Sequence, residues 1–134
     1  MIVIDCSALV HALIDKGSRG EAVRDKIATD DLAAPGLLDY EIASALFGMA
    51  RGTRSGTPKL ERPALDEALD TYQALTIRRY DALPFWPRVR ILSANLSPYD
   101  APYTALAEAL GTTLVTADAR IKRSGAARCP VEVI

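Results

Sequence analysis

The sequence predicts an α/β domain with a central, mostly parallel five-stranded sheet flanked by helices. Short apolar runs alternate with longer stretches that carry apolar residues at helical spacing, which is typical of a parallel sheet covered on both faces. The chain has 134 residues, 49% of them hydrophobic and 25% charged. This length and composition predict one domain over residues 1–134, large enough to bury a core without disulfides or structural metals.

The expected strands are short apolar or β-branched runs bounded by acids or turn formers. Their predicted ranges are 1–4, 31–34, 76–80, 112–116 and 131–134. The first run is continuously apolar, as expected of a strand that is buried on both faces. A predicted helix separates each strand from the next, which leaves room for parallel crossover connections.

The expected helices carry apolar stripes or capping signals. Their predicted ranges are 7–14, 19–28, 37–51, 63–75, 84–95, 97–110 and 118–123. In the third, Ile42, Leu46 and Met49 recur at helical spacing. Ser97 is a suitable N-cap for the sixth, and Gly111 is a suitable C-terminal stop. The clearest break is the Gly- and Thr-containing segment 52–58, which is too short to be a domain linker.

The charge and hydropathy of the sequence limit the partners and the location that we expect for the protein. The net charge is −1, so no global basic field attracts nucleic acid, and any such partner must be held by local patches or by metal. No apolar stretch is long enough to span a bilayer. The chain runs directly into an apolar strand without a charged leader, so we expect a cytoplasmic protein. Cys6 and Cys129 are expected at opposite edges of the sheet and therefore as free thiols.

Four carboxylates are placed where a parallel α/β fold forms its ligand sites, beyond the carboxyl edge of the sheet. Asp5 and Asp118 follow the first and fourth predicted strands, and Glu41 and Asp100 lie near the starts of two predicted helices. Clustered carboxylates repel one another unless a cation neutralises them. We therefore expect these four acids to form a metal site.

Helix capping is the alternative explanation for three of the four. Asp5 and Asp118 are plausible N-caps, and the spacing of Ser97 and Asp100 resembles a capping box. Glu41 is explained least by capping because it borders the buried stripe of its helix. Their joint placement nevertheless favours a common site.

Two hydroxyl residues lie close to these acids in the sequence, and one further acid has a similar position but is not assigned to the site. Ser7 and Thr116 offer hydroxyls close to Asp5 and Asp118 and are expected to support them. Asp81 also follows a predicted strand and is the best decoy among the remaining acids. No histidine is needed as a base, which agrees with the presence of a single histidine.

The segments around these acids resemble the PIN-domain family, specifically the VapC-like toxin ribonucleases of type II toxin–antitoxin systems. The matching segments are residues 1–10, 34–46, 96–107 and 114–120. Each segment alone is weakly specific, but their order and spacing cover nearly the whole chain. Two departures are mild, because neither removes a carboxylate: Cys6 stands where the family often has threonine, and Pro102 follows Asp100 where a less rigid residue is common.

The resemblance implies a metal-dependent endoribonuclease with Asp5, Glu41, Asp100 and Asp118 as its acidic quartet. It also implies Mg²⁺ or Mn²⁺, an RNA substrate, a homodimer and neutralisation by a cognate antitoxin protein. In our hypothesis Asp5 and Asp100 bind one metal ion directly, while Glu41 and Asp118 act through water or hold a second ion.

Two basic stretches could guide RNA to this acidic site, or could be solvated surface. They consist of Arg51, Arg54, Lys59 and Arg62, and of Arg120, Lys122, Arg123 and Arg128. Arginine–phosphate pairing would position RNA without reading its sequence.

Two other enzyme classes that place an aspartate after the first strand need residues that this sequence lacks. A haloacid-dehalogenase-like phosphatase needs an acid at position 7, where this chain has Ser7, and a phosphoacceptor receiver domain needs a lysine after a late strand, where Ala117 and Asp118 follow Thr116. A PIN-like RNA- or protein-binding module without catalysis remains the alternative.

Overall fold

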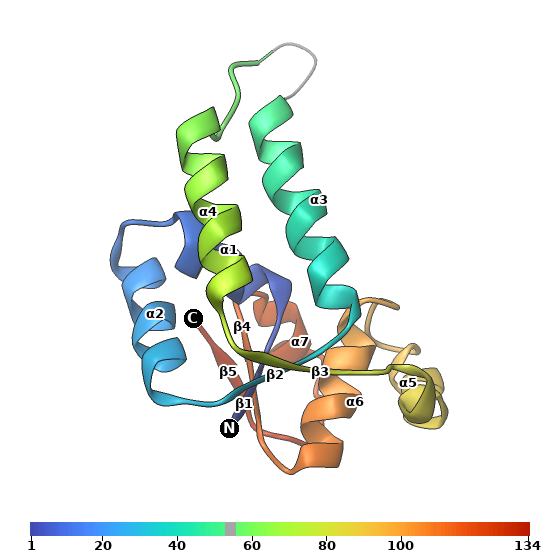
Figure 1. Ribbon diagram of the computed structural model, residues 1–134. Helices are drawn as coiled ribbons and strands as arrows, with labels where there is room; N and C mark the ends of the chain where they lie inside the picture. The colour runs from blue at the N-terminus through green and yellow to red at the C-terminus, as the bar shows by residue number, and fades with distance from the viewer. Residues whose placement is uncertain (53–55) are drawn as a thin grey trace.

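The computed structural model describes residues 1–52 and 56–134, and it contains a five-stranded parallel sheet (Figure 1). The strands are β1 (Ile2–Ile4), β2 (Leu32–Pro35), β3 (Ile77–Tyr80), β4 (Thr113–Thr116) and β5 (Val131–Val133). Their order across the sheet is β3-β2-β1-β4-β5, and all four neighbouring pairs are parallel. The predicted fold class is confirmed.

The helices begin and end close to their predicted positions. They are α1 (Cys6–Ile14), α2 (Ser18–Thr29), α3 (Leu37–Arg51), α4 (Arg62–Ala74), α5 (Trp86–Leu92), α6 (Asp100–Leu110) and α7 (Ala119–Arg123). The single helix predicted over 84–95 is wrong: a 3₁₀ turn at Leu83–Phe85 precedes α5, which ends at Leu92. Prolines 84 and 87 lie at the starts of these two segments, because a residue without an N–H fits best in a first turn.

The strand order reverses direction between β1 and β4. The chain passes from β1 to β2 and β3 on one side, and then crosses back to β4 on the other side of β1. In open parallel sheets the crevice beyond the carboxyl ends of the strands at such a switch point is where ligands bind. The fold therefore points to the ends of β1 and β4 as the position of a functional site.

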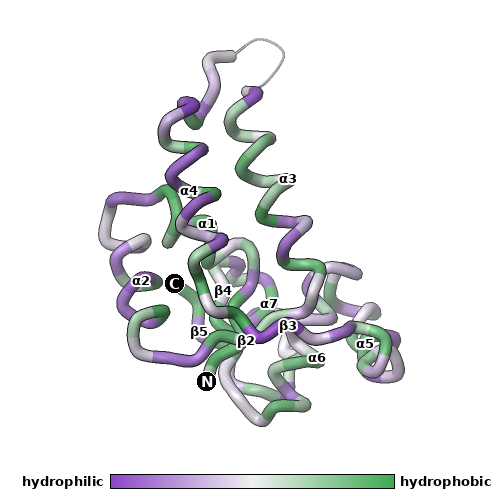
Figure 2. The backbone as a smooth tube through the Cα atoms, in the orientation of Figure 1, coloured by the Kyte–Doolittle hydropathy of each residue, from purple (hydrophilic) through white to green (hydrophobic). Residues whose placement is uncertain are grey.

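The core is built on the central strands and on α6. Every residue of β1 and β2 is buried, and in α6 the run from Ala101 to Ala107 is buried on all sides. This helix packs against β1, β2 and β4, which explains why it is apolar around its whole circumference. Figure 2 shows hydrophobic colour gathered on the central strands, whereas α2 is mostly hydrophilic.

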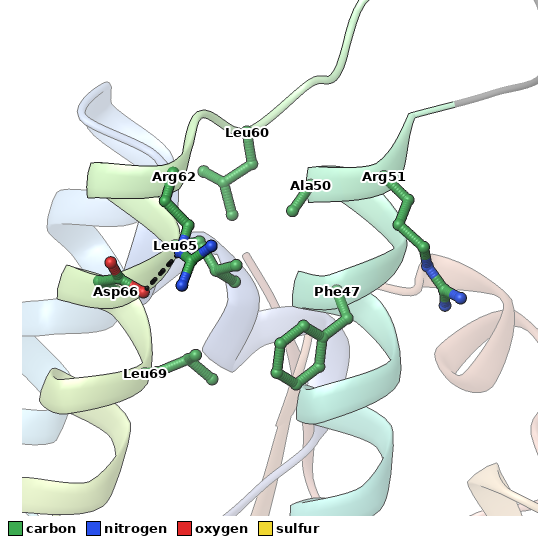
Figure 3. Close-up of a pocket in the computed structure, with 8 residues that line it drawn as sticks. All are labelled: Phe47, Ala50, Arg51, Leu60, Arg62, Leu65, Asp66 and Leu69. Carbon is green, nitrogen blue, oxygen red and sulfur yellow. Dashed lines mark ion pairs between the residues drawn. The ribbon is translucent and has the colours of Figure 1, made fainter.

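Helices α3 and α4 extend away from the sheet as a hairpin (Figure 1). An apolar pocket of about 550 Å³ lies between them towards the tip, where Phe47 of α3 faces Leu65 and Leu69 of α4 (Figure 3). Arg62 pairs with Asp66 at its rim, at 3.4 Å.

Candidate functional site at the ends of β1 and β4

The parallel pairing of β1 with β4 places the two strand ends next to each other. Ile4 is in register with Val115, and the Asp5 N–H donates to the Val115 carbonyl at 3.1 Å. Asp5 follows β1 directly, and Asp118 follows β4 after one residue. Both aspartates are N-caps, of α1 and α7 respectively, so the capping alternative holds for each.

Ser7 and Thr116 connect these two strand ends. The Ser7 hydroxyl donates to Asp5 Oδ1 at 2.7 Å, accepts from the Ala117 N–H at 2.9 Å and lies 3.2 Å from Thr116 Oγ1. Thr116 Oγ1 accepts from the Asp118 N–H at 2.9 Å. The two hydroxyls therefore hold the backbone after β4 against the carboxylate that follows β1.

Asp5 is the most deeply buried acid of the group, with 4% of its surface exposed. Its Oδ1 accepts from both the Ser7 hydroxyl and the Ala8 N–H. Burial raises the pKa of Asp5 because it disfavours the charged form, and the negative charge of Asp100 adds to this rise. The hydrogen bonds from Thr116, Ala8 and Ser7 oppose it.

Glu41 is held by Tyr103, whose hydroxyl donates to Glu41 Oε2 at 2.5 Å. Tyr103 lies in α6 and is 2% exposed. Burial raises the pKa of Glu41, and the charges of Asp5 and Asp100 raise it further. Tyr103 is not among the residues that the sequence predicts for the site. Its position one helical turn after Asp100 could have indicated it, because a buried tyrosine needs a partner for its hydroxyl.

Asp100 contacts Ser97 through the serine hydroxyl, whereas the acid of a capping box accepts from the backbone N–H of the N-cap residue. The Ser97 hydroxyl donates to Asp100 Oδ2 at 2.8 Å and accepts from the Asp100 N–H at 3.0 Å. The carbonyl of Ser97 accepts from the Ala101 N–H, but the N-cap of α6 is Tyr99, so the prediction of Ser97 as the N-cap is wrong. Asp100 is the first residue of α6 and the acid whose charge acts on Asp5 and Glu41.

Asp118 differs from the other three acids. The Arg120 guanidinium contacts both of its oxygens, at 3.0 Å from Nε to each and 2.6 Å from Nη2 to Oδ2, and the Arg120 N–H also reaches Oδ1. This arginine lowers the pKa of Asp118. The structure thus brings Asp5, Glu41 and Asp100 within electrostatic reach of one another and pairs the fourth acid with a cation of its own.

Hydrogen bonds orient the carboxylates of Asp5, Glu41 and Asp100. These bonds reach Oδ1 of Asp5, Oε2 of Glu41 and Oδ2 of Asp100. Over residues 1–52 and 56–134, no group of three acidic, histidine or cysteine side chains is gathered closely enough to hold a metal ion. In the part of the chain that the structure describes, the acids therefore form no closed ligand cage.

Other charged residues are paired elsewhere. Asp39 binds Arg79 and the Tyr72 hydroxyl, and Glu108 binds Arg88 at 2.7 Å. Asp81, the decoy after β3, is exposed. Of the two basic stretches, Arg54 lies outside the described residues.

The two cysteines are both free, as predicted. Cys6 lies beside the acids, and burial together with the charges of Glu41 and Asp5 raises its pKa to about 12. This thiol is therefore un-ionised near neutral pH.

Fold and site together define a parallel α/β domain with an acidic site at its switch point, and comparison with known proteins identifies the family. The PIN-domain family model matches residues 2–126. The chain is 42% identical to the VapC ribonuclease Mb0985 of Mycobacterium bovis over 134 residues, which is 100% of this chain and 98% of that protein. The chain belongs to the PIN-domain family, and it is similar to VapC ribonucleases over its full length.

Two solved structures have the same fold. PAE2754 from Pyrobaculum aerophilum matches with a TM-score of 0.70 at 22% identity, covering 98% of this chain and 83% of that one. VapBC2 from Rickettsia felis, bound to a DNA fragment from their promoter, matches with a TM-score of 0.62 at 17% identity, covering 98% of both chains. Among the described helices, none is long and apolar enough to cross a membrane.

Proposed function

We propose that this protein is a cytoplasmic endoribonuclease that depends on Mg²⁺ or Mn²⁺ and acts as the toxin of a type II toxin–antitoxin pair. The observation that carries the proposal is the grouping of Asp5, Glu41 and Asp100 at the switch point of the sheet, where the charge of Asp100 helps to raise the pKa of Asp5 and the charges of Asp5 and Asp100 help to raise that of Glu41. A relative with 42% identity over the whole chain is named a ribonuclease, which supports the same activity.

The donor set fits a hard divalent cation. Carboxylate oxygens are the ligands that Mg²⁺ prefers, and Mg²⁺ usually keeps several waters while it binds only one or two carboxylates directly. Such a hydrated ion does not require the three-residue cage that the described residues lack. When bound, the ion would favour deprotonation of an attacking water and offset the charge that develops on the scissile phosphate.

The chain's own residues would position this chemistry. Asp5 is held in place by Ser7 and the Ala8 N–H, and Asp100 by Ser97, so both carboxylates are already oriented. We assign direct metal binding to these two acids. Glu41, oriented by Tyr103, would act through water or hold a second ion. Asp118 could join them only after Arg120 releases it.

The decisive experiment replaces Asp5 and Asp100 separately by asparagine. RNA cleavage with added Mg²⁺ or Mn²⁺ should fall about 1000-fold or more in each variant, because several kcal/mol of transition-state stabilisation are lost. Asp81→Asn is the matched control, since Asp81 also follows a strand of the sheet but is exposed, and it should cleave normally. Equal cleavage by all variants, purified in parallel, would point to a contaminating ribonuclease and leave a non-catalytic binding module as the better account.

Partners follow from the same proposal. We propose a cognate antitoxin protein and a homodimer; the name of the Rickettsia felis VapBC2 structure supports the first. Co-purification of the tagged protein with a small protein from its own host tests the first, and light scattering of the purified protein tests the second. Sequencing of RNA ends after induction would identify the substrate.

A further inference from the structure

Two exposed tyrosines flank the acidic site. Tyr40 is 81% exposed and directly precedes Glu41, and Tyr99 is 64% exposed and directly precedes Asp100. Large side chains with aromatic rings are usually more buried than this, because each carries considerable apolar area. Both rings therefore offer faces to solvent beside residues of the proposed site.

The two rings border the same hollow of the surface. A depression of about 470 Å³ is lined by Tyr40, Glu41, Ser44 and Ala45 from α3, by Cys6 and by Tyr99. Tyr99 also lines a second depression of about 360 Å³, together with Asp100 and Arg120. Tyr99 thus stands between two hollows, each of which contains one of the acids.

The charge of this surface limits how RNA can be held there. Acidic side chains repel phosphates, and the chain as a whole has a net charge of −1. A metal ion can bridge to the scissile phosphate, but the flanking nucleotides need attraction of another kind. Stacking on aromatic side chains supplies it for unpaired bases and tolerates any sequence, because every base has a π face.

We propose that Tyr40 and Tyr99 stack against unpaired bases on either side of the scissile phosphate, so that the substrate segment must be single-stranded. The inference rests on the proposed ribonuclease function. Tyr99, between the two hollows, separates the nucleotide next to Glu41 from the nucleotide next to Asp100.

Binding of a labelled RNA tests this directly. The probe is a fluorescein-labelled single-stranded RNA of mixed sequence, and the protein is Asp5→Asn with Mg²⁺ present, so that binding is measured without cleavage. Adding Tyr40→Ala or Tyr99→Ala should weaken binding about 5- to 100-fold, whereas Tyr40→Phe and Tyr99→Phe should stay within about twofold of the parent. Trp86→Ala, which removes another exposed aromatic ring from α5, should leave binding unchanged.

A duplex of the same sequence separates stacking from phosphate binding. Paired bases are not available to the rings, so the alanine variants should bind the duplex as the parent does. The inference is overturned if the tyrosine variants and Trp86→Ala bind single strands alike, or if the alanine variants lose only antitoxin binding, which would make the rings a protein contact. Failure of the proposed function is a different result, namely no metal-dependent cleavage by the chain with Asp5 intact.

Discussion

The ends of β1 and β4 look equivalent in the fold but differ in their electrostatics. Each strand is followed by an aspartate that caps the next helix. Burial and the charge of Asp100 raise the pKa of Asp5, whereas the Arg120 guanidinium lowers the pKa of Asp118. Helix capping therefore does not distinguish a proposed metal ligand from a paired acid: the neighbours of each carboxylate do.

The largest expected difference between the two strand ends is in metal affinity. Asp5→Asn should weaken Mn²⁺ binding at least about 100-fold, because the lost charge acts directly on the ion and each tenfold change corresponds to about 1.4 kcal/mol. Asp118→Asn should weaken it by no more than about tenfold. Calorimetric titration of both variants measures this, and equal losses would show that Asp118 is as much a ligand as Asp5.

The next effect concerns the tyrosine that orients Glu41. Tyr103→Phe removes the hydroxyl that donates to Glu41 Oε2, and loss of such a supporting bond lowers metal affinity or activity by roughly 10- to 100-fold. Tyr72→Phe is the matched control, because Tyr72 makes the same kind of bond to Asp39 at 2.5 Å. If both variants cleave RNA equally well, the Tyr103 hydroxyl serves only stability.

The bounds of α3 could be predicted from the sequence, whereas the contact that orients Glu41 could not. Helix α3 was expected over 37–51 and has those bounds, because its stripe and its flanking glycines are local signals. The contact of Glu41 with Tyr103 spans 62 positions and depends on how α3 meets α6, which no local pattern specifies.

For Asp118, the sequence predicts the position of the residue but not the partner of its carboxylate. Asp118 was expected beside the strand end, and it is there. Its pairing with Arg120 depends on a side-chain conformation that competes with metal binding, so the position of this acid could be predicted and its partner could not.

The third prediction uses the opposite pKa shifts of the two strand ends. In EDTA the folded protein should become more stable as the pH falls from about 8 towards 4.5 and 3.8, the ordinary pKa values of Glu41 and Asp5, because both groups have raised pKa values and so bind protons more readily when folded than when unfolded. Asp118 acts in the other direction: its pKa lies below the ordinary 3.8, so the stability it contributes is lost only at lower pH.

Thermal melts across this pH range test the sign. Asp5→Asn should flatten this gain and should melt at a higher temperature than the unmodified chain at about pH 8, since it removes a buried charge. Asp118→Asn should leave this part of the curve as it is. A stability that rises with pH over the same interval would contradict the raised pKa values.

The smallest effect is expected from replacing Arg120, whose ion pair with Asp118 makes the ends of β1 and β4 electrostatically different. Arg120→Gln removes the ion pair but leaves a backbone N–H for the capping bond to Asp118. An exposed ion pair is weak, so Mn²⁺ affinity should rise by no more than about fivefold as Asp118 becomes available. Lys122→Gln, in the same helix, is the control.

RNA binding by the same variant should move the opposite way. Arg120 lines the depression that contains Asp100, where it can pair with a phosphate, so its loss should weaken RNA binding while metal binding improves. Opposite changes in the two affinities would mean that Arg120 exchanges Asp118 for the substrate phosphate. Parallel changes, or none, would mean that the pair with Asp118 is a static cap and that Asp118 stays apart from the other three acids.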